Sequence, residues 1–379
     1  MKNLLKALLN KLIRLFWIFP IKKNKIVFRS SMGKKYNCNP KYISEYLLEN
    51  CKNEFDIVWL LSEPERYSYL KKKGVKIFKP DSLGAVFSLS TAGFIIDNHG
   101  IQSYLPKRNG QTVINTWHGG GSYKKGKKEC RDFEKDYTAL ANEKTDYFIS
   151  SCEKFSKNNL ADIYEKRPSA ILPFGMARND LFFTDTESTA ERVKKALSIP
   201  EGTGLIMFAP TFRLMNKDTN YGIDSEAVIE ACEKRFSKPF VFGYRLHEFI
   251  ENNASDLKAK KLLSLNSYED MQELIAAADV IITDYSSLIW DAAVAKKPCF
   301  IFAKDLADYM DFRGFFTPIN EWPFPLSESN EKLFENIVSF NEGEYLNAVS
   351  RHLSDLGSYE TGESAKRTAE LIKNILQKN

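Results

Sequence analysis

The chain of 379 residues is long enough for two core-forming domains, because a domain commonly runs about 100–200 residues. Its composition, 43% hydrophobic and 27% charged, excludes a disordered or low-complexity polypeptide, and the formal net charge of +5 is modest. The cysteines are scattered and form no C-x-x-C pair, which indicates free thiols in a reducing cytosol rather than a disulfide framework or a zinc site. They are Cys38, Cys51, Cys130, Cys152, Cys232 and Cys299.

The first 25 residues form a basic, amphipathic stretch with seven Lys or Arg residues and no acidic residue. No run reaches the roughly 18–20 apolar residues that a spanning helix needs, and there is no small-residue cleavage site of the signal-peptide kind. We expect residues 1–22 to form a helix on an anionic cytoplasmic leaflet. The alternative is an ordinary helix packed on the protein with a solvated basic face. The apolar residues at helical spacing are Leu5, Leu8, Leu9, Leu12, Phe16 and Phe19.

Apolar segments with strand character alternate with helical segments along the rest of the chain. This alternation predicts an α/β protein in which helices wrap parallel sheets. The boundary between two domains is expected near residue 197, which gives domains at 23–197 and 198–362 and a C-terminal helix at 363–379. The expected strands are 25–28, 55–60, 75–78, 93–97, 111–115, 146–150, 204–210, 240–244, 262–265, 280–282 and 297–302.

The strand at 111–115 runs directly into Thr116, Trp117 and His118, which three glycines follow. Reactive groups of doubly wound sheets lie at the carboxyl ends of strands, and glycines let a substrate approach the backbone closely. Because histidine titrates near neutral pH, His118 is a candidate general base. The alternative is a histidine satisfied by a loop carbonyl. A basic loop follows, suited to a phosphate-rich acceptor or lipid headgroups, or merely solvated: Lys124, Lys125, Lys127 and Lys128.

Two strand ends in the second half carry basic side chains. Arg213 follows the strand at 204–210, and it either clamps phosphate or pairs with a surface acid. Arg245 and His247 follow the strand at 240–244 and share one face of an extended segment. A buried or edge position is the alternative for His247.

The stretch from Asp279 to Trp290 combines a short apolar run, a polar turn and the start of a helical segment. The turn contains Asp284, Ser286 and Ser287. Unpaired N–H groups and a positive dipole end at a helix start, beside serine hydroxyls, are what an anionic phosphate needs. The alternative is that Asp284 or Ser286 merely caps the helix.

These motifs together resemble the CDP-glycerol glycerophosphotransferase family, which builds teichoic acids and related capsular polymers. The matches keep one order and spacing along most of the chain. They are N-K-I-V-F with N-P-K-Y-I (24–43), I-D-N-H-G (96–100), N-T-W-H-G (115–119), M-A-R-N-D-L-F (176–182), A-P-T-F-R (209–213), R-L-H (245–247), T-D-Y-S-S (283–287), K-P-C-F-I-F (297–302) and D-L-A-D-Y through R-G-F (305–315).

The resemblance implies a GT-B fold, in which a Rossmann-like acceptor domain and a Rossmann-like nucleotide-donor domain face each other across a cleft. It also implies peripheral attachment to the cytoplasmic face of the cell membrane. The implied reaction moves glycerol phosphate from CDP-glycerol to a hydroxyl of a lipid-linked or polymer acceptor and releases CMP. No nucleic acid partner and no tightly bound cofactor are expected, although Mg²⁺ can accompany the donor.

By the same resemblance His118 is the base, and His247 contacts the donor pyrophosphate or protonates the leaving CMP. Asp284 orders its turn or binds a glycerol hydroxyl. The remaining assigned residues divide between donor and acceptor. Those for the donor phosphates are Arg213, Arg245, Ser286 and Ser287, and those for the acceptor are Gly119, Lys124 and Lys125.

The chain departs from the family pattern at two places. Glu248 stands where proline commonly follows the second histidine, and Gly120-Gly121-Ser122-Tyr123 replaces a T-P-L-K pattern, which bears on the acceptor. The lack of a large N-terminal extension favours a primase-like or capsule enzyme. The alternatives are a CDP-ribitol-dependent transferase, a GT-B glycosyltransferase that uses a nucleotide sugar, and a non-catalytic membrane-surface scaffold.

Overall fold

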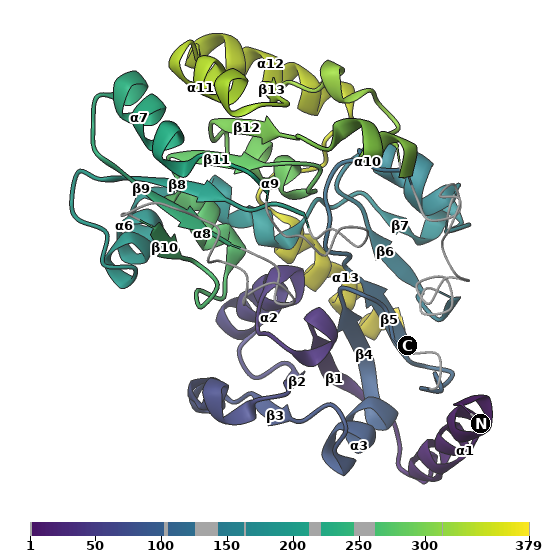
Figure 1. The fold of residues 1–379 in the computed structure, drawn as a ribbon. Coiled ribbons are helices and arrows are strands. Elements are labelled where there is room, and N and C mark those ends of the chain that lie inside the picture. The colour runs from purple at the N-terminus through teal and green to yellow at the C-terminus, as the bar shows by residue number, and fades with distance from the viewer. Residues whose placement is uncertain are drawn as a thin grey trace. The chain divides into compact units, whose positions relative to one another are not determined.

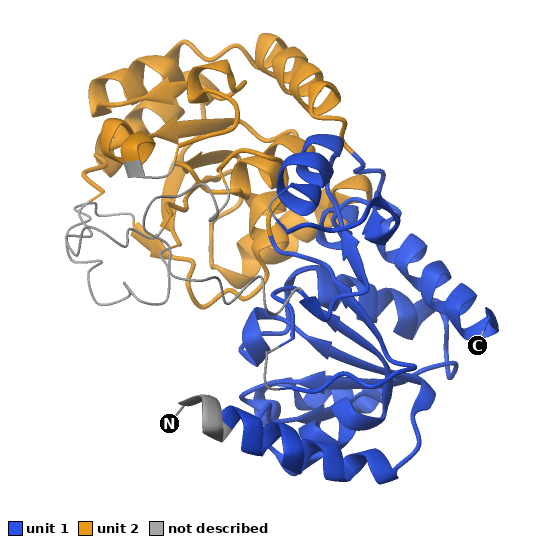
Figure 2. Cartoon of the chain, turned by 90° about the vertical axis from the view of Figure 1, so that its right-hand side faces the viewer, with its two compact units in different colours: residues 1–118, 133–180, 359–379 blue, residues 119–132, 181–358 orange. Residues whose placement is uncertain are grey.

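The computed structural model describes residues 2–101, 105–125, 143–162, 164–211, 221–245, 262–312 and 314–378. The chain divides into two compact units, each built around one parallel sheet (Figure 1; Figure 2). Unit 1 comprises Met1–His118, Phe133–Asp180 and Tyr359–Asn379, and unit 2 comprises Gly119–Asp132 and Leu181–Ser358. The predicted α/β class with parallel sheets is confirmed. The expected domain at 23–197 is interrupted, because residues 119–132 belong to unit 2, and it ends at Asp180 rather than near residue 197; the C-terminal helix belongs to unit 1.

The sheet of unit 1 has seven strands in the order β3-β2-β1-β4-β5-β6-β7, and every neighbouring pair is parallel. The order reverses between β1 and β4, which lie side by side at the centre. The strands are β1 (Lys22–Arg29), β2 (Asp56–Leu60), β3 (Lys76–Phe78), β4 (Ala92–Asp97), β5 (Thr112–Asn115), β6 (Tyr147–Ile149) and β7 (Ile171–Leu172).

Both faces of this sheet are buried, because alternate residues of each strand enter different cores. Ile26 and Phe28 of β1 belong to one hydrophobic cluster, whereas Val27 belongs to another. The first cluster contains residues of two helices, among them Leu47 and Ile372. Within the described residues, the helices of unit 1 are α1 (Lys2–Arg14), α2 (Cys38–Asn50), α3 (Leu83–Thr91), α5 (Glu153–Phe155) and α13 (Ser364–Lys378).

Asp180 attaches the C-terminal helix to unit 1. Its carboxylate accepts hydrogen bonds from the N–H groups of Ser364 at 3.0 Å and Ala365 at 2.8 Å, so it satisfies two unpaired donors at the start of α13. Burial raises the pKa of Asp180 to about 6, although both hydrogen bonds favour the ionised form. The M-A-R-N-D-L-F segment therefore has a structural role at Asp180.

The sheet of unit 2 has six strands in the order β10-β9-β8-β11-β12-β13, again with parallel neighbours only. Counted from β8, this is the 3-2-1-4-5-6 order of a dinucleotide-binding Rossmann sheet, and the order reverses between β8 and β11. The strands are β8 (Gly204–Phe208), β9 (Phe240–Tyr244), β10 (Leu262–Ser264), β11 (Val280–Thr283), β12 (Cys299–Phe302) and β13 (Leu326–Ser327).

The helices of unit 2 include three that the sequence did not predict. Helix α10 includes residues 308–312 of the aromatic-rich segment 308–316, and α11 and α12 close the unit. Their N-caps are Ser329 and Asn341, each of which accepts a backbone N–H. The helices are α6 (Thr186–Ala196), α7 (Ser225–Phe236), α8 (Met271–Ala277), α9 (Leu288–Val294), α10 (Leu306–Phe312), α11 (Asn330–Val338) and α12 (Glu342–Asp355).

The predicted N-terminal helix is present as α1, followed by a short 3-10 turn, η1 (Leu15–Ile18). The guanidinium of Arg108 donates to the carbonyl oxygens of Trp17 at 3.1 Å and Phe19 at 2.8 Å, which joins this turn to unit 1. Among the described helices, none combines the length and apolar character needed to cross a membrane.

Candidate active site

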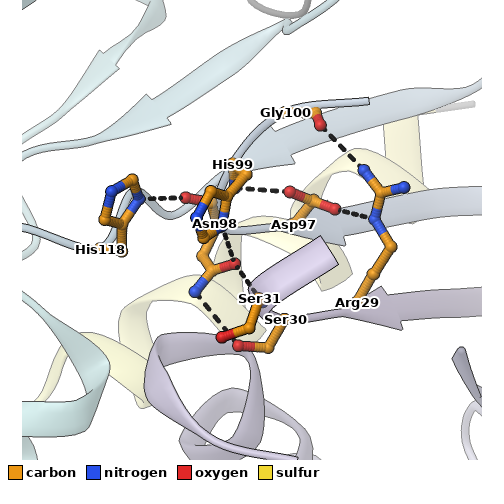
Figure 3. A network of polar contacts seen from close by, with 8 residues as sticks. All are labelled: Arg29, Ser30, Ser31, Asp97, Asn98, His99, Gly100 and His118. Atoms are coloured by element: carbon orange, nitrogen blue, oxygen red, sulfur yellow. Dashed lines mark hydrogen bonds and ion pairs between the residues drawn. The ribbon is translucent and has the colours of Figure 1, made fainter. Parts of the chain in front are cut away.

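The loops that follow β1, β4 and β5 meet at the centre of the sheet of unit 1. Ligands of doubly wound sheets bind outside the carboxyl ends of strands, at the point where the strand order reverses. That point lies between β1 and β4. Ser30 and Ser31 follow β1, Asn98 and His99 follow β4, and the chain leaving β5 reaches His118 (Figure 3).

One hydrogen bond defines the tautomer of His118. Its Nδ1 lies 2.8 Å from the main-chain oxygen of Asn98. A carbonyl oxygen can only accept, so Nδ1 must carry the proton, and in the neutral ring Nε2 is the basic nitrogen. The alternative interpretation, a histidine satisfied by a loop carbonyl, is therefore correct for Nδ1 and leaves Nε2 able to accept a proton.

Two aromatic rings fix the plane of the His118 imidazole. The ring of His99 stacks on it with centroids 4.2 Å apart and planes 8° apart, and Trp117 lies at 4.7 Å and 29°. Loss of water lowers the pKa of His118, and the neighbouring His99 and Arg178 lower it further. His118 is exposed to solvent, which limits the effect of desolvation, and the hydrogen bond to Asn98 and the charge of Asp97 act in the opposite direction, but the net effect lowers the pKa. His118 is therefore neutral at pH 7.

Asn98 holds both histidines and the loop after β1. Its side-chain oxygen accepts from the N–H of Ser31 at 3.0 Å and lies 2.8 Å from Nδ1 of His99, while its main-chain oxygen accepts from His118. Its amide nitrogen donates to the hydroxyl of Ser30 at 3.1 Å. Figure 3 shows that the Asn98 side chain and main chain point to different partners.

A buried ion pair supports this arrangement from the strands. The guanidinium of Arg29 pairs with the carboxylate of Asp97 and also donates to the carbonyl of Gly100 at 2.9 Å. Asp97 accepts the N–H of His99 at 2.5 Å through its other oxygen. The chain of contacts from Arg29 through His99 to His118 joins β1 to the candidate base (Figure 3).

Asn39 secures the other side of the His118 loop. This fully buried side chain donates to the carbonyls of Thr116 at 2.9 Å and Trp117 at 3.0 Å, and accepts the N–H of Arg178 at 3.0 Å. Trp117 adopts a φ of 54°, which is uncommon for a residue with a side chain and is held by these contacts. The place of Asn39 in the N-P-K-Y-I match was the signal in the sequence for this role.

In unit 2, the loops after β8 and β11 meet where the strand order reverses. Asp284 is buried, and its carboxylate accepts from the N–H of Thr211 at 2.9 Å and from the Thr211 hydroxyl at 2.6 Å. It therefore ties the two loops together. This geometry agrees with the predicted ordering role, whereas a glycerol contact remains a prediction.

The two serines that follow are half-buried. The hydroxyl of Ser286 accepts the N–H of Leu288, the first residue of α9, at 3.3 Å, whereas the N-cap of that helix is Ser287. Ser287 makes no side-chain cap bond. Helix α9 has only seven residues, so its dipole adds little and the hydroxyls must supply most of any phosphate binding.

The basic residues predicted for the donor are only partly described. Arg245 donates to the carbonyls of Leu265 at 3.3 Å, Tyr268 at 2.5 Å and Glu269 at 3.2 Å, so it supports the loop after β10. Arg213 and His247 lie outside the described residues, as do Lys127 and Lys128.

The predicted acceptor residues lie in the segment 119–125, which belongs to unit 2 directly after His118. Gly119 is buried, Lys124 is half-buried with its Nζ 5.9 Å from the ring centre of Tyr309, and Lys125 is exposed. The expectation that the glycines leave room for a substrate is wrong for Gly120 and Gly121, because side chains of unit 2 fill the space at both positions.

Within the described ranges, no group of three or more His, Cys, Asp or Glu side chains is placed to hold a metal ion. The cysteines in those ranges are free thiols. Buried Cys152, Cys232 and Cys299 have raised pKa values because burial disfavours the thiolate, which leaves them unreactive.

Two Rossmann-type parallel sheets, each with polar loops at its strand-order reversal, define a GT-B-like α/β protein. The structure is similar to that of the wall teichoic acid polymerase TagF, with a TM-score of 0.83 at 23% identity over 100% of this chain and 96% of that one. It is less similar to a putative UDP-N-acetylglucosamine 2-epimerase from Listeria monocytogenes, with a TM-score of 0.57 at 14% identity, covering 95% and 98%. At these identities the likeness concerns the fold. One TagF structure was obtained with a CDPG soak.

The sequence profile of the CDP-Glycerol:Poly(glycerophosphate) glycerophosphotransferase family matches residues 11–374. The chain belongs to this family.

The chain is similar to curated relatives that are named for different polyol phosphates. A teichoic acid poly(glycerol phosphate) polymerase of Bacillus subtilis is 29% identical over 87% of this chain, which spans only 46% of that protein. A teichoic acid glycerol-phosphate transferase of Staphylococcus aureus is 26% identical, covering 92% of this chain and 93% of the relative. The teichoic acid ribitol-phosphate polymerase TarL of the same species is also 26% identical, covering 94% and 63%.

Proposed function

We propose that the protein transfers glycerol phosphate from CDP-glycerol to a hydroxyl of a membrane-linked acceptor, with release of CMP, in teichoic acid or capsular polymer synthesis. The observation that carries the proposal is the hydrogen bond from Nδ1 of His118 to the Asn98 carbonyl, which leaves Nε2 as a neutral, oriented base in a member of this family. Positioning and a base of the correct protonation state are what phosphoryl transfer asks of a protein.

The proposed step begins when Nε2 of His118 accepts the proton of the acceptor hydroxyl. The oxygen then forms a bond to the glycerol-bearing phosphorus of the donor. The bond from that phosphorus to the bridging oxygen breaks, and CMP leaves with the electron pair. The resulting His118 imidazolium is destabilised by His99 and Arg178, which favours return of the proton to the leaving phosphate or to water.

On the donor side we assign the phosphates to the loop at Ser286 and Ser287, with Asp284 as its structural support. The hydroxyls lie at the reversal of strand order in unit 2, the position at which doubly wound sheets bind ligands. Arg213, Arg245 and His247 complete this assignment as predictions, and Mg²⁺ bound to the donor is compatible with it. A diphosphate needs positive charge as its negative charge moves to the leaving group.

The competing donors are CDP-ribitol and a nucleotide sugar. Relatives of similar identity are named for glycerol phosphate and for ribitol phosphate, so the polyol must be measured. The test compares CMP release from CDP-glycerol and CDP-ribitol with turnover of UDP-sugars, using a soluble poly(glycerol phosphate) oligomer as acceptor. Release of CMP from CDP-glycerol supports the proposal. A preference for CDP-ribitol changes the transferred group from glycerol phosphate to ribitol phosphate. Turnover of UDP-sugars alone refutes the proposal. No turnover of any donor favours a non-catalytic scaffold.

We also propose that α1 and η1 lie on an anionic membrane at the cytoplasmic face. Leu15 is 65% exposed and Ile18 is 81% exposed, whereas Ile13 on the same segment is buried. Exposed apolar side chains beside Lys11 and Arg14 suit insertion at a headgroup boundary. The packed-helix alternative explains Ile13 but does not explain the exposure of Leu15 and Ile18.

A further inference from the structure

The backbone at Gly120 and Gly121 lies against the indole of Trp290, and all three residues belong to unit 2. A Cβ atom at Gly120 would lie 1.8 Å from Cδ1 and 2.3 Å from Cγ of Trp290. A Cβ atom at Gly121, where φ is +65°, would lie 2.3 Å from Cε2 of Tyr123 and 3.0 Å from Cε3 of Trp290. Carbon atoms repel strongly at such separations, so both positions require glycine while the indole stays in place.

Trp290 is itself rigidly placed. It is fully buried in α9, every residue of which is buried. Its main-chain N–H donates to the carbonyl of Ser287 at 3.1 Å, so the helix that carries the indole begins at the proposed donor serines. Because a close-packed helix yields less readily than a loop, a clash at Gly120 displaces the glycine segment rather than Trp290.

A second attachment fixes the far end of the same segment. The hydroxyl of Tyr123 is hydrogen-bonded to Nε2 of His352 at 3.0 Å, and the Tyr123 carbonyl accepts the N–H of Phe316 at 2.9 Å. The N–H of Lys125 donates to the carbonyl of Gly314 at 3.3 Å. The segment is therefore attached at the glycines and again at residues 123–125, and these contacts set where the two lysines emerge.

We propose that Trp290 is a positioning residue for acceptor recognition: it holds Gly120 and Gly121 and thereby orients Gly119, Lys124 and Lys125. The inference rests on the proposed function, which assigns acceptor binding to this segment. Trp290 acts through the backbone of the segment and needs no contact with either substrate. The acceptor segment and the donor serines then share one rigid support, but a change at the glycines affects use of the acceptor while the donor loop remains intact.

The first test is Gly120→Ala, with Gly343→Ala as the matched control. A Cβ atom at Gly343 would lie 3.6 Å from Oδ1 of Asn341, which is an ordinary contact. We expect Gly120→Ala to raise the KM for a poly(glycerol phosphate) oligomer about tenfold or more, since misplacement by 1 Å can cost about a hundredfold. Calorimetric affinity for CDP-glycerol should stay within a factor of about two, as expected when only one substrate's contacts change. Gly343→Ala should alter neither quantity.

The second test is the double variant Gly120→Ala, Trp290→Ala. Removing the indole opens space for the added methyl group, so the double variant should use the acceptor better than Gly120→Ala alone, although Trp290→Ala alone impairs it. An unchanged acceptor KM in Gly120→Ala, an equal loss of donor and acceptor binding, or a double variant no better than the single one overturns the inference. If Trp290→Ala does not fold, the separate donor and acceptor measurements on Gly120→Ala decide. Failure of the wild-type protein to release CMP refutes the proposed function instead.

Discussion

Asn39→Ala removes the amide that holds the backbone just before His118. The side chain is fully buried and makes three hydrogen bonds with backbone groups, to the carbonyls of Thr116 and Trp117 and from the N–H of Arg178, besides one to Sδ of Met176. Alanine leaves these three buried groups without their partner. At about 1 kcal/mol for each hydrogen bond, the free energy of unfolding should fall by about 3 kcal/mol.

Activity should fall further than this loss of stability explains. The hydrogen bonds of Asn39 help to hold Trp117 at its uncommon φ. Because His118 is the next residue, their loss should shift the position of its imidazole. A shift of about 1 Å in the base corresponds to roughly a hundredfold loss in kcat. The assay is CMP release from CDP-glycerol at a temperature where chemical denaturation shows the variant to be folded.

Asn336→Ala is the matched control, because its amide nitrogen also donates to two partners, the Leu326 carbonyl at 3.0 Å and the Ser327 hydroxyl at 2.9 Å. It should lose stability and keep kcat. The reasoning is refuted if folded Asn39→Ala turns over at the wild-type rate, or if both variants lose kcat in proportion to their stability.

Three further predictions concern pH, the donor and the membrane. Because its pKa is lowered, His118 should remain an active base as the pH falls through the ordinary value of 6.5, and kcat/KM should decline only below it; an acid limb at or above 6.5 contradicts this. Replacing Ser286 and Ser287 together by alanine should weaken calorimetric binding of CDP-glycerol by about 1–3 kcal/mol with little change in thermal unfolding, and unchanged binding contradicts the donor assignment. Ile18→Asp should release the protein from vesicles of phosphatidylglycerol in co-sedimentation, whereas Phe183→Asp, also at an exposed large apolar residue, should not; equal release by both contradicts the membrane proposal.

The two sheets could be predicted because each strand is a short apolar run bounded by turn residues, and those runs are buried on both faces. The strand at 111–115 was expected to deliver His118 to the carboxyl edge, and β5 does so. The order of the strands within each sheet could not be predicted from the sequence. Without knowing that β4 lies between β1 and β5, the sequence offers no reason to place His99 on His118 or Arg29 beside Asp97.

The errors have similar causes. Gly120 and Gly121 indicated an open backbone, but the indole that fills this space comes from α9, far along the chain. Asn39 and Arg178 meet because α2 and the M-A-R-N-D-L-F segment pack together, and neither segment alone shows that contact. The strand β13 has two residues, too short for a periodic pattern to be detected.

His118→Asn tests the central claim most directly. The asparagine amide can still donate to the Asn98 carbonyl, but it offers no basic nitrogen in place of Nε2. CMP release from CDP-glycerol should fall by about 10²–10⁴-fold, the usual contribution of a general base, while calorimetric affinity for CDP-glycerol stays unchanged. Turnover by folded His118→Asn at the wild-type rate would contradict the assignment of His118 as the base.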